Sequence, residues 1–226
     1  MAENALTDLF KNIADAIRKA KYTSEPIVAN DFPREINDID IHDICSIWES
    51  KEVVISRGAI PNNAFFSNSQ ISKFTICDGV TRIGSAAFQN SPVVTDITIP
   101  DSVTYIGANA FFYCVKLTSI IIPDSVLYMG AYAFGNCSKL TSATIGTGIE
   151  KINSQTFYNC PLLAKVIIKK ADAVVTLLSK NVFDKSLIAT GTDDGYIYVP
   201  SNLVDSYKSA TNWVTYADKI KAIGSE

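Results

Sequence analysis

The chain has 226 residues, 47% of them hydrophobic and 19% charged, and a formal net charge of −3 at pH 7. This composition is typical of a globular protein with one or two domains and a sizeable core. The charge is small and shows no long run of one sign, which argues against a nucleic-acid partner. No apolar run approaches the roughly 20 residues of a transmembrane helix, and the N-terminus lacks the features of a secretory signal. We therefore expect a chain that stays in the cytoplasm, leaves by another route or is cut from a longer protein.

Residues 1–50 are predicted to form a helical head. A second, short helix is expected at 31–36, where Pro33 stands in the first turn. The single histidine, His42, precedes Cys45 by three residues, but two ligands do not make a metal site. The first helix is expected over 5–20, where apolar residues follow the 3.6-residue spacing: Leu6, Leu9, Phe10, Ile13 and Ile17.

Residues 51–170 are predicted to form a solenoid. A strand is expected at 53–55, and the repeat begins part-way through a unit near residue 59. Apolar residues then recur with a fixed period, in the spacing Leu117-x-x-Ile120-x-Ile122. This is the pattern of leucine-rich repeats, whose units bury their apolar sides by stacking on their neighbours. Phenylalanine marks the period, recurring every 23 residues at Phe65, Phe88, Phe111, Phe134 and Phe157.

Each unit should contain one short strand whose first and third residues point inward and whose middle residue points outward. Pro61 stands one period before Gly84 and cannot take positive φ, so the chain path is expected to differ there. We expect positive φ at Gly84, Gly107, Gly130 and Asn153, which share one position, because glycine and asparagine enter the left-handed region at low cost. The strands are expected at 74–77, 97–99, 120–122, 143–145 and 166–168. The outward residues would be Thr75, Thr98, Ile121, Thr144 and Ile167.

Residues 171–226 are predicted to close the solenoid. The period fails after Ile168, since Phe183 follows Phe157 by 26 residues. A final strand is expected at 195–200. Two helices should follow, one from a Ser201 cap to about residue 209 and one from an Asn212 cap towards residue 222. The last coil would be covered by Trp213, Tyr216 and Ile220.

Short phrases recur within the solenoid. Ile-Pro-Asp-Ser-Val occurs at 99–103 and 122–126, and Phe-x-Asn-Cys at 134–137 and 157–160. They resemble the BspA-type leucine-rich repeat, common on bacterial surface proteins, and the phrase at 197–208 resembles the segment that closes many such arrays. The resemblance implies a mainly β solenoid with short helical turns and helical caps at both ends. It also implies a location at the cell surface or outside the cell.

The head carries a second resemblance. Leu-Thr-Asp-Leu-Phe-Lys-Asn-Ile at 6–13 and Asn-Asp-Phe-Pro-Arg-Glu-Ile at 30–36 resemble a segment of predicted phage and prophage structural proteins of gut bacteria. That resemblance implies a tail-associated virion protein that displays the solenoid. The same segment can equally shield the open end of the repeat array, which such arrays need, and the two interpretations are compatible.

Two columns of the repeat are unusually aromatic. One holds Tyr105 and Tyr128, with Arg82 and Lys151 on either side along the same column. Tyr113 lies beside the other, which holds Phe66, Phe112 and Tyr158. Tyrosine with arginine is typical of interaction hot spots. Phe66 and Phe112 can instead simply pack between coils. The residues predicted to bind a ligand are therefore Tyr105, Tyr128, Arg82, Lys151 and Tyr113.

Two further columns have structural and metal-binding interpretations. The cysteines at 114, 137 and 160 share a repeat position that other units fill with small residues, so they are expected to be buried and structural. Stacked coils would also bring the three thiols near one another, where they could bind a metal or form a disulfide. A metal site is disfavoured because a histidine ligand and the second shell of hydrogen-bonding partners are missing. The aspartates at 78, 101 and 124 open turns, where aspartate usually caps its own turn. The alternative, a calcium ladder, lacks the oxygen-rich loop spacing of known sites.

The sequence contains no phosphate-binding loop, no HExxH and no nucleophile motif around His42. We therefore predict a protein that is not an enzyme and has no cofactor or metal. Two function classes remain. The first is a binding or adhesion module that recognises a protein or a glycan, and the second is a phage or prophage structural component.

Overall fold

The structure is a computed structural model that describes residues 52–69, 73–95, 97–190 and 194–225. The chain divides into two compact units, Met1–Glu52 and Val53–Glu226, and all described residues except Glu52 belong to the second. The predicted helical head, with His42 and Cys45, lies outside the described residues.

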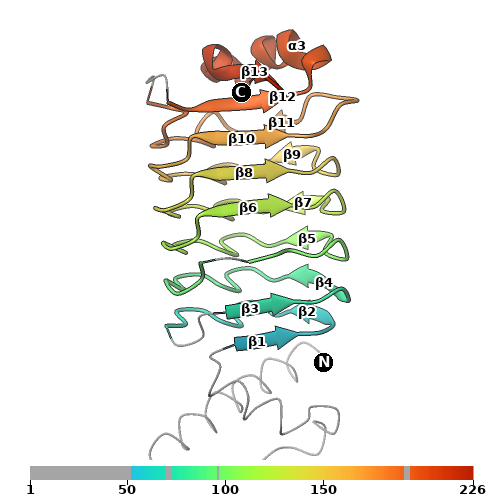
Figure 1. The fold of residues 1–226 in the computed structure, drawn as a ribbon, viewed down its shortest axis with the longest axis vertical. Helices are drawn as coiled ribbons and strands as arrows, with labels where there is room; N and C mark the ends of the chain where they lie inside the picture. Colours follow the sequence, from blue (N-terminus) through green and yellow to red (C-terminus); the bar gives the residue numbers. More distant parts are fainter. Residues whose placement is uncertain (1–51, 70–72, 96, 191–193, 226) are drawn as a thin grey trace, which may run out of the picture. The chain divides into compact units, whose positions relative to one another are not determined.

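From Val53 onward the chain winds in stacked coils, most of which contribute two short strands (Figure 1). The first strands are β1 (Glu52–Ile55), β3 (Lys73–Ile76), β6 (Ser119–Ile122), β8 (Ser142–Ile145), β10 (Lys165–Ile168) and β12 (Tyr196–Val199). The second strands are β2 (Gly58–Ile60), β4 (Val80–Ile83), β5 (Tyr105–Ile106), β7 (Tyr128–Met129), β9 (Lys151–Ile152) and β11 (Thr176–Leu177).

The strands pair in parallel, coil on coil. The first strands form a two-stranded sheet, β1-β3, and a five-stranded sheet in the order β13-β12-β10-β8-β6, where β13 is Ile220–Ala222. The second strands form the sheets β2-β4-β5-β7 and β11-β9. Residues one repeat apart pair directly, as in Ile120 with Ala143. This arrangement confirms the predicted mainly β parallel solenoid.

A column of stacked phenylalanine rings runs through the core. The centroids of Phe88 and Phe111 lie 5.2 Å apart with their planes 4° from parallel, and Phe134 continues the stack at the same spacing. Phe183 also belongs to it, 5.8 Å from Phe157, although its coil is longer than the others. The predicted alignment of the repeat phenylalanines is therefore confirmed, and it extends one coil further than the strict period.

Four of the five predicted repeat strands exist, and the fifth is absent for a chemical reason. Ile97 and Ile99 are buried and Thr98 is exposed, as expected, but 97–99 belongs to no described strand. In other coils the residue after the strand donates its N–H to the preceding coil: Cys77 to Ile55, Gly146 to Ile122 and Lys169 to Ile145, each at 2.9 Å. Proline has no N–H. Pro100 and Pro123 occupy this position on either side of the interruption.

The expectation of positive φ at the shared glycine position was wrong. Positive φ among the described glycines occurs at Gly58, Gly79 and Gly224. The shared position instead needs glycine for close contact between coils: a Cβ on Gly107 would lie 2.4 Å from the Ser85 nitrogen, and one on Gly130 2.3 Å from the Ala108 nitrogen. Asn153 does not take positive φ either.

The same result removes the expected detour at Pro61. The Ala64 N–H donates to the Pro61 carbonyl at 3.3 Å, as the Ala87 N–H does to the Gly84 carbonyl one coil later. Pro61 therefore makes the ordinary turn of the repeat.

Left-handed backbone occurs at two other positions of the 23-residue coils, and at one position of the longer coil, which the sequence analysis missed. Asparagine, the residue other than glycine that tolerates this region best, fills about half of these places and was the available signal. The first column is Asn63, Ala86, Asn109, Tyr132 and Gln155. The second is Ser67, Asn90, Tyr113, Asn136, Asn159 and, in the longer coil, Lys185.

The C-terminal segment covers the last coil with less helix than predicted. It contains two 3-10 helices, η3 (Ser201–Leu203) and η4 (Trp213–Lys219), and one short α-helix, α3 (Val204–Ser209). Neither Ser201 nor Asn212 caps a helix through its side chain, since Pro200 precedes η3 and Asn212 instead donates to the Leu177 carbonyl at 2.8 Å. The expected helix to residue 222 was wrong at its end, where β13 pairs with β12.

The covering residues themselves were predicted correctly. Trp213, Tyr216 and Ile220 are buried, and the ring of Tyr216 meets Phe183 edge-on at 5.3 Å. Within the part of the chain that the structure describes, no helix is long and apolar enough to span a membrane.

Candidate binding surface

The second strands carry a ladder of outward side chains from Arg82, Tyr105 and Tyr128. Parallel pairing places Arg82 beside Tyr105 and Tyr105 beside Tyr128. The two phenol rings stack at 4.8 Å with planes 10° apart, and the Arg82 guanidinium carbon lies 3.9 Å above the Tyr105 ring centroid. Tyr128 is 43% exposed and Arg82 is exposed. Three of the predicted site residues are therefore in contact on one accessible face; we call them the tyrosine ladder.

Lys151 follows the tyrosine ladder across a break in the sheet. It is exposed on β9, which pairs with β11, whereas the sheet that carries the two tyrosines ends at β7. The structure thus places Lys151 in the same column, one coil further on, but in a separate sheet.

Tyr113 belongs to a different surface. Its ring lies 6.4 Å from that of Phe112, and Phe112 meets Tyr132 edge-on at 5.9 Å. Tyr132 in turn meets Tyr158 edge-on at 6.2 Å, and the Lys185 amino group lies 5.0 Å from the Tyr158 ring centroid. We call these five residues the turn cluster. The predicted set of five site residues therefore divides between two surfaces.

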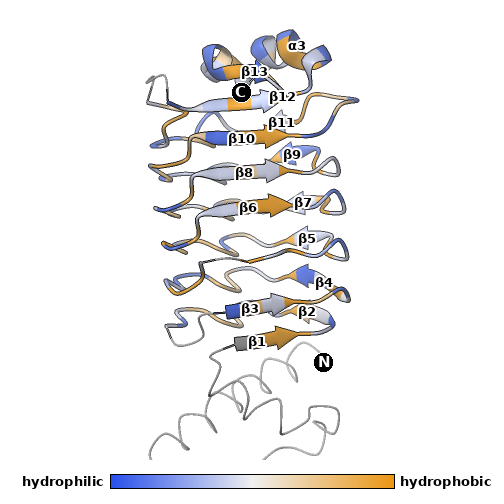
Figure 2. Cartoon of the chain, in the orientation of Figure 1, coloured by the Kyte–Doolittle hydropathy of each residue, from blue (hydrophilic) through white to orange (hydrophobic). Residues whose placement is uncertain are grey.

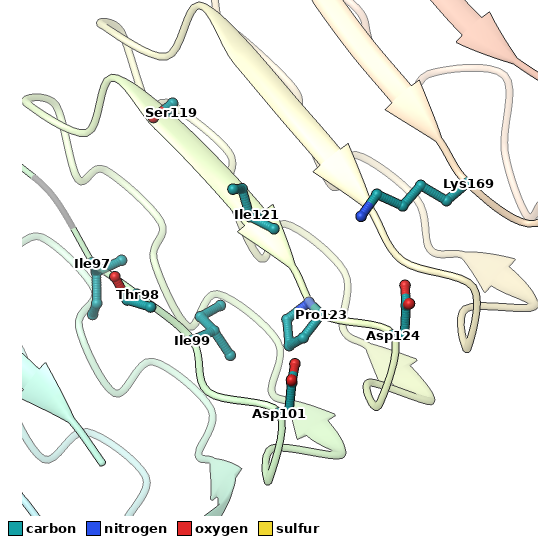
Figure 3. A pocket seen from close by; sticks show the side chains of 9 residues that line it. All are labelled: Ile97, Thr98, Ile99, Asp101, Ser119, Ile121, Pro123, Asp124 and Lys169. Carbon is teal, nitrogen blue, oxygen red and sulfur yellow. The ribbon is translucent and has the colours of Figure 1, made fainter. Parts of the chain in front are cut away.

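A concavity of about 480 Å³ opens on the first-strand face beside the interruption at 97–99 (Figure 3). Its apolar part includes the buried Pro123 and the side chain of Ile121, which is 64% exposed. Lys169 extends towards it from the end of β10 (Figure 3). Its lining combines apolar side chains with carboxylates, hydroxyls and an amino group, and contains neither histidine nor cysteine. The lining residues are Ile97, Thr98, Ile99, Asp101, Ser119, Ile121, Pro123, Asp124 and Lys169.

The hydropathy of this face changes from coil to coil. Figure 2 shows the end of β6 as hydrophobic and β8 as near neutral. The aspartate column lies at its edge, where the Asp124 carboxylate accepts the Thr147 N–H of the next coil at 2.9 Å. Asp124 therefore stabilises the turn of its neighbouring coil. Over the described ranges, no three His, Cys, Asp or Glu side chains are grouped so that they could hold a metal ion.

The cysteine column makes one repeated hydrogen bond. Cys114, Cys137 and Cys160 are fully buried, and each thiol donates to the carbonyl of the repeat phenylalanine in the preceding coil, at 3.1, 3.3 and 3.1 Å. The Ser91 hydroxyl does the same to Phe65 at 2.7 Å. Burial raises the pKa of the Cys114 thiol to about 12 and raises that of Cys137 well above its ordinary value. These thiols therefore serve as buried donors, and all described cysteines are free.

A third aromatic group, on β12, escaped the sequence analysis. The Lys221 amino group lies 3.3 Å from the Tyr196 ring centroid, and that of Lys165 lies 5.4 Å from the Tyr198 ring centroid. The alternation Tyr-Ile-Tyr already placed both rings on one side of a strand. The lysines come from β10 and β13, and the loss of the strict period concealed their register.

Comparison with known proteins agrees with this architecture. The model of the BspA type leucine rich repeat region matches residues 58–189 in six copies. The crystal structure of the pneumococcal vaccine antigen PcpA is 21% identical, with a TM-score of 0.59 over 76% of this chain and 40% of that chain. The chain thus spans less than half of that structure.

Two further solved structures are similar. A leucine rich repeat protein of T. pallidum is 20% identical, with a TM-score of 0.49 over 56% of this chain and 72% of that chain. One from Bacteroides ovatus is 22% identical, with a TM-score of 0.48 over 66% of this chain and 39% of that chain. No curated protein sequence matches significantly. The family model covers more than half of the chain, which therefore belongs to the BspA-type leucine-rich repeat family.

Proposed function

We propose that this protein is a non-enzymatic binding module that recognises a protein ligand through the tyrosine ladder. The observation that carries the proposal is the stacked pair Tyr105–Tyr128 with Arg82 over its first ring. Tyrosine and arginine dominate the energetics of protein interfaces because they combine large contact area with hydrogen-bonding ends. Leucine-rich repeat solenoids generally offer such columns as extended binding faces.

The ladder is arranged before any ligand arrives. Each ring sits on a strand of one hydrogen-bonded sheet, and the two rings stack on each other. Side chains that are already ordered lose little conformational entropy when they bind, which favours affinity. The guanidinium group adds donors for a carboxylate or carbonyl of the partner.

Lys151 extends this surface by one coil. Its exposed amino group would contribute at the rim of an interface, where charges mainly affect the rate of association and its dependence on salt. Catalysis forms no part of the proposal, because no motif for a nucleophile, a phosphate loop or a metal site accompanies the ladder.

Family membership supports a location at a bacterial cell surface, where an adhesion role would follow. A tail-associated phage or prophage protein is the alternative, and it rests on the sequence of the head segment. Neighbouring genes separate the two: tail genes favour the virion protein, and secretion or anchoring genes favour the surface protein.

The test is affinity capture on the immobilised full chain, followed by titration of the captured protein. Tyr105→Ala with Tyr128→Ala should weaken binding by about 2 kcal/mol, roughly 30-fold, because both anchor rings are lost. Tyr105→Phe with Tyr128→Phe, which keeps the rings, should retain most of the affinity. Tyr113→Ala, on the turn cluster, is the matched control and should leave the affinity unchanged. Equal affinity of the double alanine variant and the parent would remove the ladder from the proposal.

A further inference from the structure

Two tyrosines of the turn cluster occupy backbone positions that disfavour them. Tyr113 has φ of 63° and Tyr132 has φ of 56°. A bulky residue is an outlier in the left-handed region, where asparagine is accepted more readily. The corresponding residues of other coils include Asn90, Asn136 and Asn159 in the Tyr113 column. The repeat imposes this conformation on every coil, and residues that fit it poorly cluster at functional sites.

Tyr113 also interrupts a ladder of side-chain amides. On one side, Asn90 donates its amide to the Ser67 hydroxyl at 2.9 Å. On the other side, the Asn159 amide donates to the side-chain oxygen of Asn136. An asparagine at position 113 would suit both its backbone and its neighbours, yet the chain has a ring there that is 48% exposed. Neither local conformation nor burial accounts for this residue.

The rings of the turn cluster form a continuous aromatic strip. Tyr113 contacts Phe112, Tyr132 stands edge-on between Phe112 and Tyr158, and Lys185 lies over Tyr158. The space for this packing comes from Gly135: a Cβ there would lie 3.0 Å from the Phe112 ring and 3.3 Å from the Tyr132 ring. Other coils have a phenylalanine, a glutamine or a tyrosine at the repeat position of Gly135. The glycine leaves room for the ring of Tyr132 between Phe112 and Tyr158.

At its Tyr113 end, the strip is flanked by amide and phenol groups, and its charged member, Lys185, lies at the other end over Tyr158. Amide and phenol groups both donate and accept. Of the described side chains that make these ring contacts, Lys185 alone is charged. Asn90 and Asn136 flank Tyr113 along the stack, at a spacing of about 4.8 Å per coil, which is close to the width of one sugar ring. A sugar presents an apolar face of C–H groups and a rim of hydroxyls, which match an aromatic face between amides.

We infer that the turn cluster is a second binding surface, and that its ligand is a neutral oligosaccharide laid across Tyr113 and its flanking asparagines. The surface is separate from the tyrosine ladder, and the inference goes beyond the proposed protein-binding function. Tyr113 supplies the exposed stacking face, and its ring contacts that of Phe112 in the same coil. Tyr132 of the next coil packs against Phe112, and the amides pair with the hydroxyl rim.

The experiment uses the full chain on an array of neutral glycans, followed by calorimetric titration with the oligosaccharide that binds best. Tyr113→Asn should weaken binding at least tenfold, while Tyr113→Phe, which keeps the ring, should stay within threefold of the parent. Tyr105→Ala with Tyr128→Ala removes the tyrosine ladder and should leave the titration unchanged. This control keeps a failure of the glycan site distinct from a failure of the protein-binding proposal.

The melting temperature gives an independent readout. Because asparagine relieves the left-handed strain and completes the amide ladder, Tyr113→Asn should melt at or above the temperature of the parent. A lower melting temperature would show that the ring is there for packing and would overturn the inference. The inference would also be overturned if no neutral glycan bound the protein, or if Tyr113→Asn bound within twofold of the parent. Capture of a peptide by these rings, in place of a glycan, would overturn it as well.

Discussion

The side-chain amide of Asn153 donates to the Met129 carbonyl at 2.7 Å and replaces a backbone bond of the repeat. In the coils before it, the N–H of the shared glycine makes this bond: Gly107 to Ile83 and Gly130 to Ile106, both at 2.9 Å. A side chain at this position keeps neighbouring backbones apart, because a Cβ at Gly130 would lie only 2.3 Å from the Ala108 nitrogen. The second-strand sheet ends here, with β7 on one side and β9 on the other.

Asn153→Ala should therefore destabilise the protein by about 1–3 kcal/mol, because the buried Met129 carbonyl would lose its donor while the separating Cβ remains. Asn153→Gly should cost less, because it permits the backbone bond. Urea unfolding followed by circular dichroism measures both. Lys151→Ala, an exposed change on β9 just before Asn153, serves as the control and should be near neutral. An alanine variant as stable as the glycine variant would contradict this account.

The sequence predicted most of the solenoid because its period is strict. Residues 23 apart must stack, so the phenylalanine column and the pair Tyr105–Tyr128 followed directly from counting. What counting could not supply is the path within one coil. Tyr113 follows Tyr105 by only eight residues, yet a turn places its ring on another surface, in contact with Phe112.

The backbone errors have a similar origin. Glycine can indicate either positive φ or close packing, and the sequence alone does not distinguish them. At Gly107 the requirement was packing, and the left-handed positions carried asparagine in other columns. At 97–99 the apolar pattern was correct for burial, but the missing donors of Pro100 and Pro123 decided the strand.

Two side chains of the C-terminal segment form hydrogen bonds with both backbone polar groups of the buried Val175. The Trp213 indole donates to the Val175 carbonyl at 2.6 Å, and the Val175 N–H donates to the Tyr207 hydroxyl at 3.0 Å. Trp213→Phe keeps an aromatic ring but leaves the carbonyl without this donor, so it should cost about 1–3 kcal/mol in chemical denaturation. Val214→Ala changes the exposed neighbour and should be close to neutral. A phenylalanine variant as stable as this control would show that the indole bond contributes nothing.

Stability should fall at alkaline pH because of the cysteine column. Burial raises the pKa of Cys114 to about 12, whereas a thiol in the unfolded chain ionises near about 8.5. The native chain therefore keeps protons that the unfolded chain loses, so stability is full below pH 8.5 and declines towards pH 12. Tyr216, whose pKa burial also raises to about 12, adds to the upper part of this range.

Replacing Cys114, Cys137 and Cys160 by serine tests this account, since Ser91 already makes the same bond in its own coil. Serine does not ionise in this range, so the triple variant should unfold at a higher pH than the parent in a titration followed by circular dichroism. An unchanged alkaline midpoint would assign the transition to the tyrosines instead.

The last prediction concerns the interrupted first-strand sheet. The interruption is caused by a missing N–H donor, so Pro123→Ala should supply an N–H that donates to the Ile99 carbonyl. One coil later, the Gly146 N–H makes the equivalent bond to the Ile122 carbonyl at 2.9 Å. The new amide should exchange its hydrogen slowly, because exchange requires the ladder bond to open. The net change in stability should be small, since the gain of about 1 kcal/mol from a hydrogen bond offsets the lost burial of the proline ring.

Hydrogen exchange followed by NMR measures the protection directly, with the Lys169 amide as the internal reference for a formed bond. Pro100→Ala provides an independent repeat of the test, with Ile76 as the acceptor. If the amide at position 123 exchanged as fast as in an unfolded peptide, the coils would be held apart by something other than the missing donor.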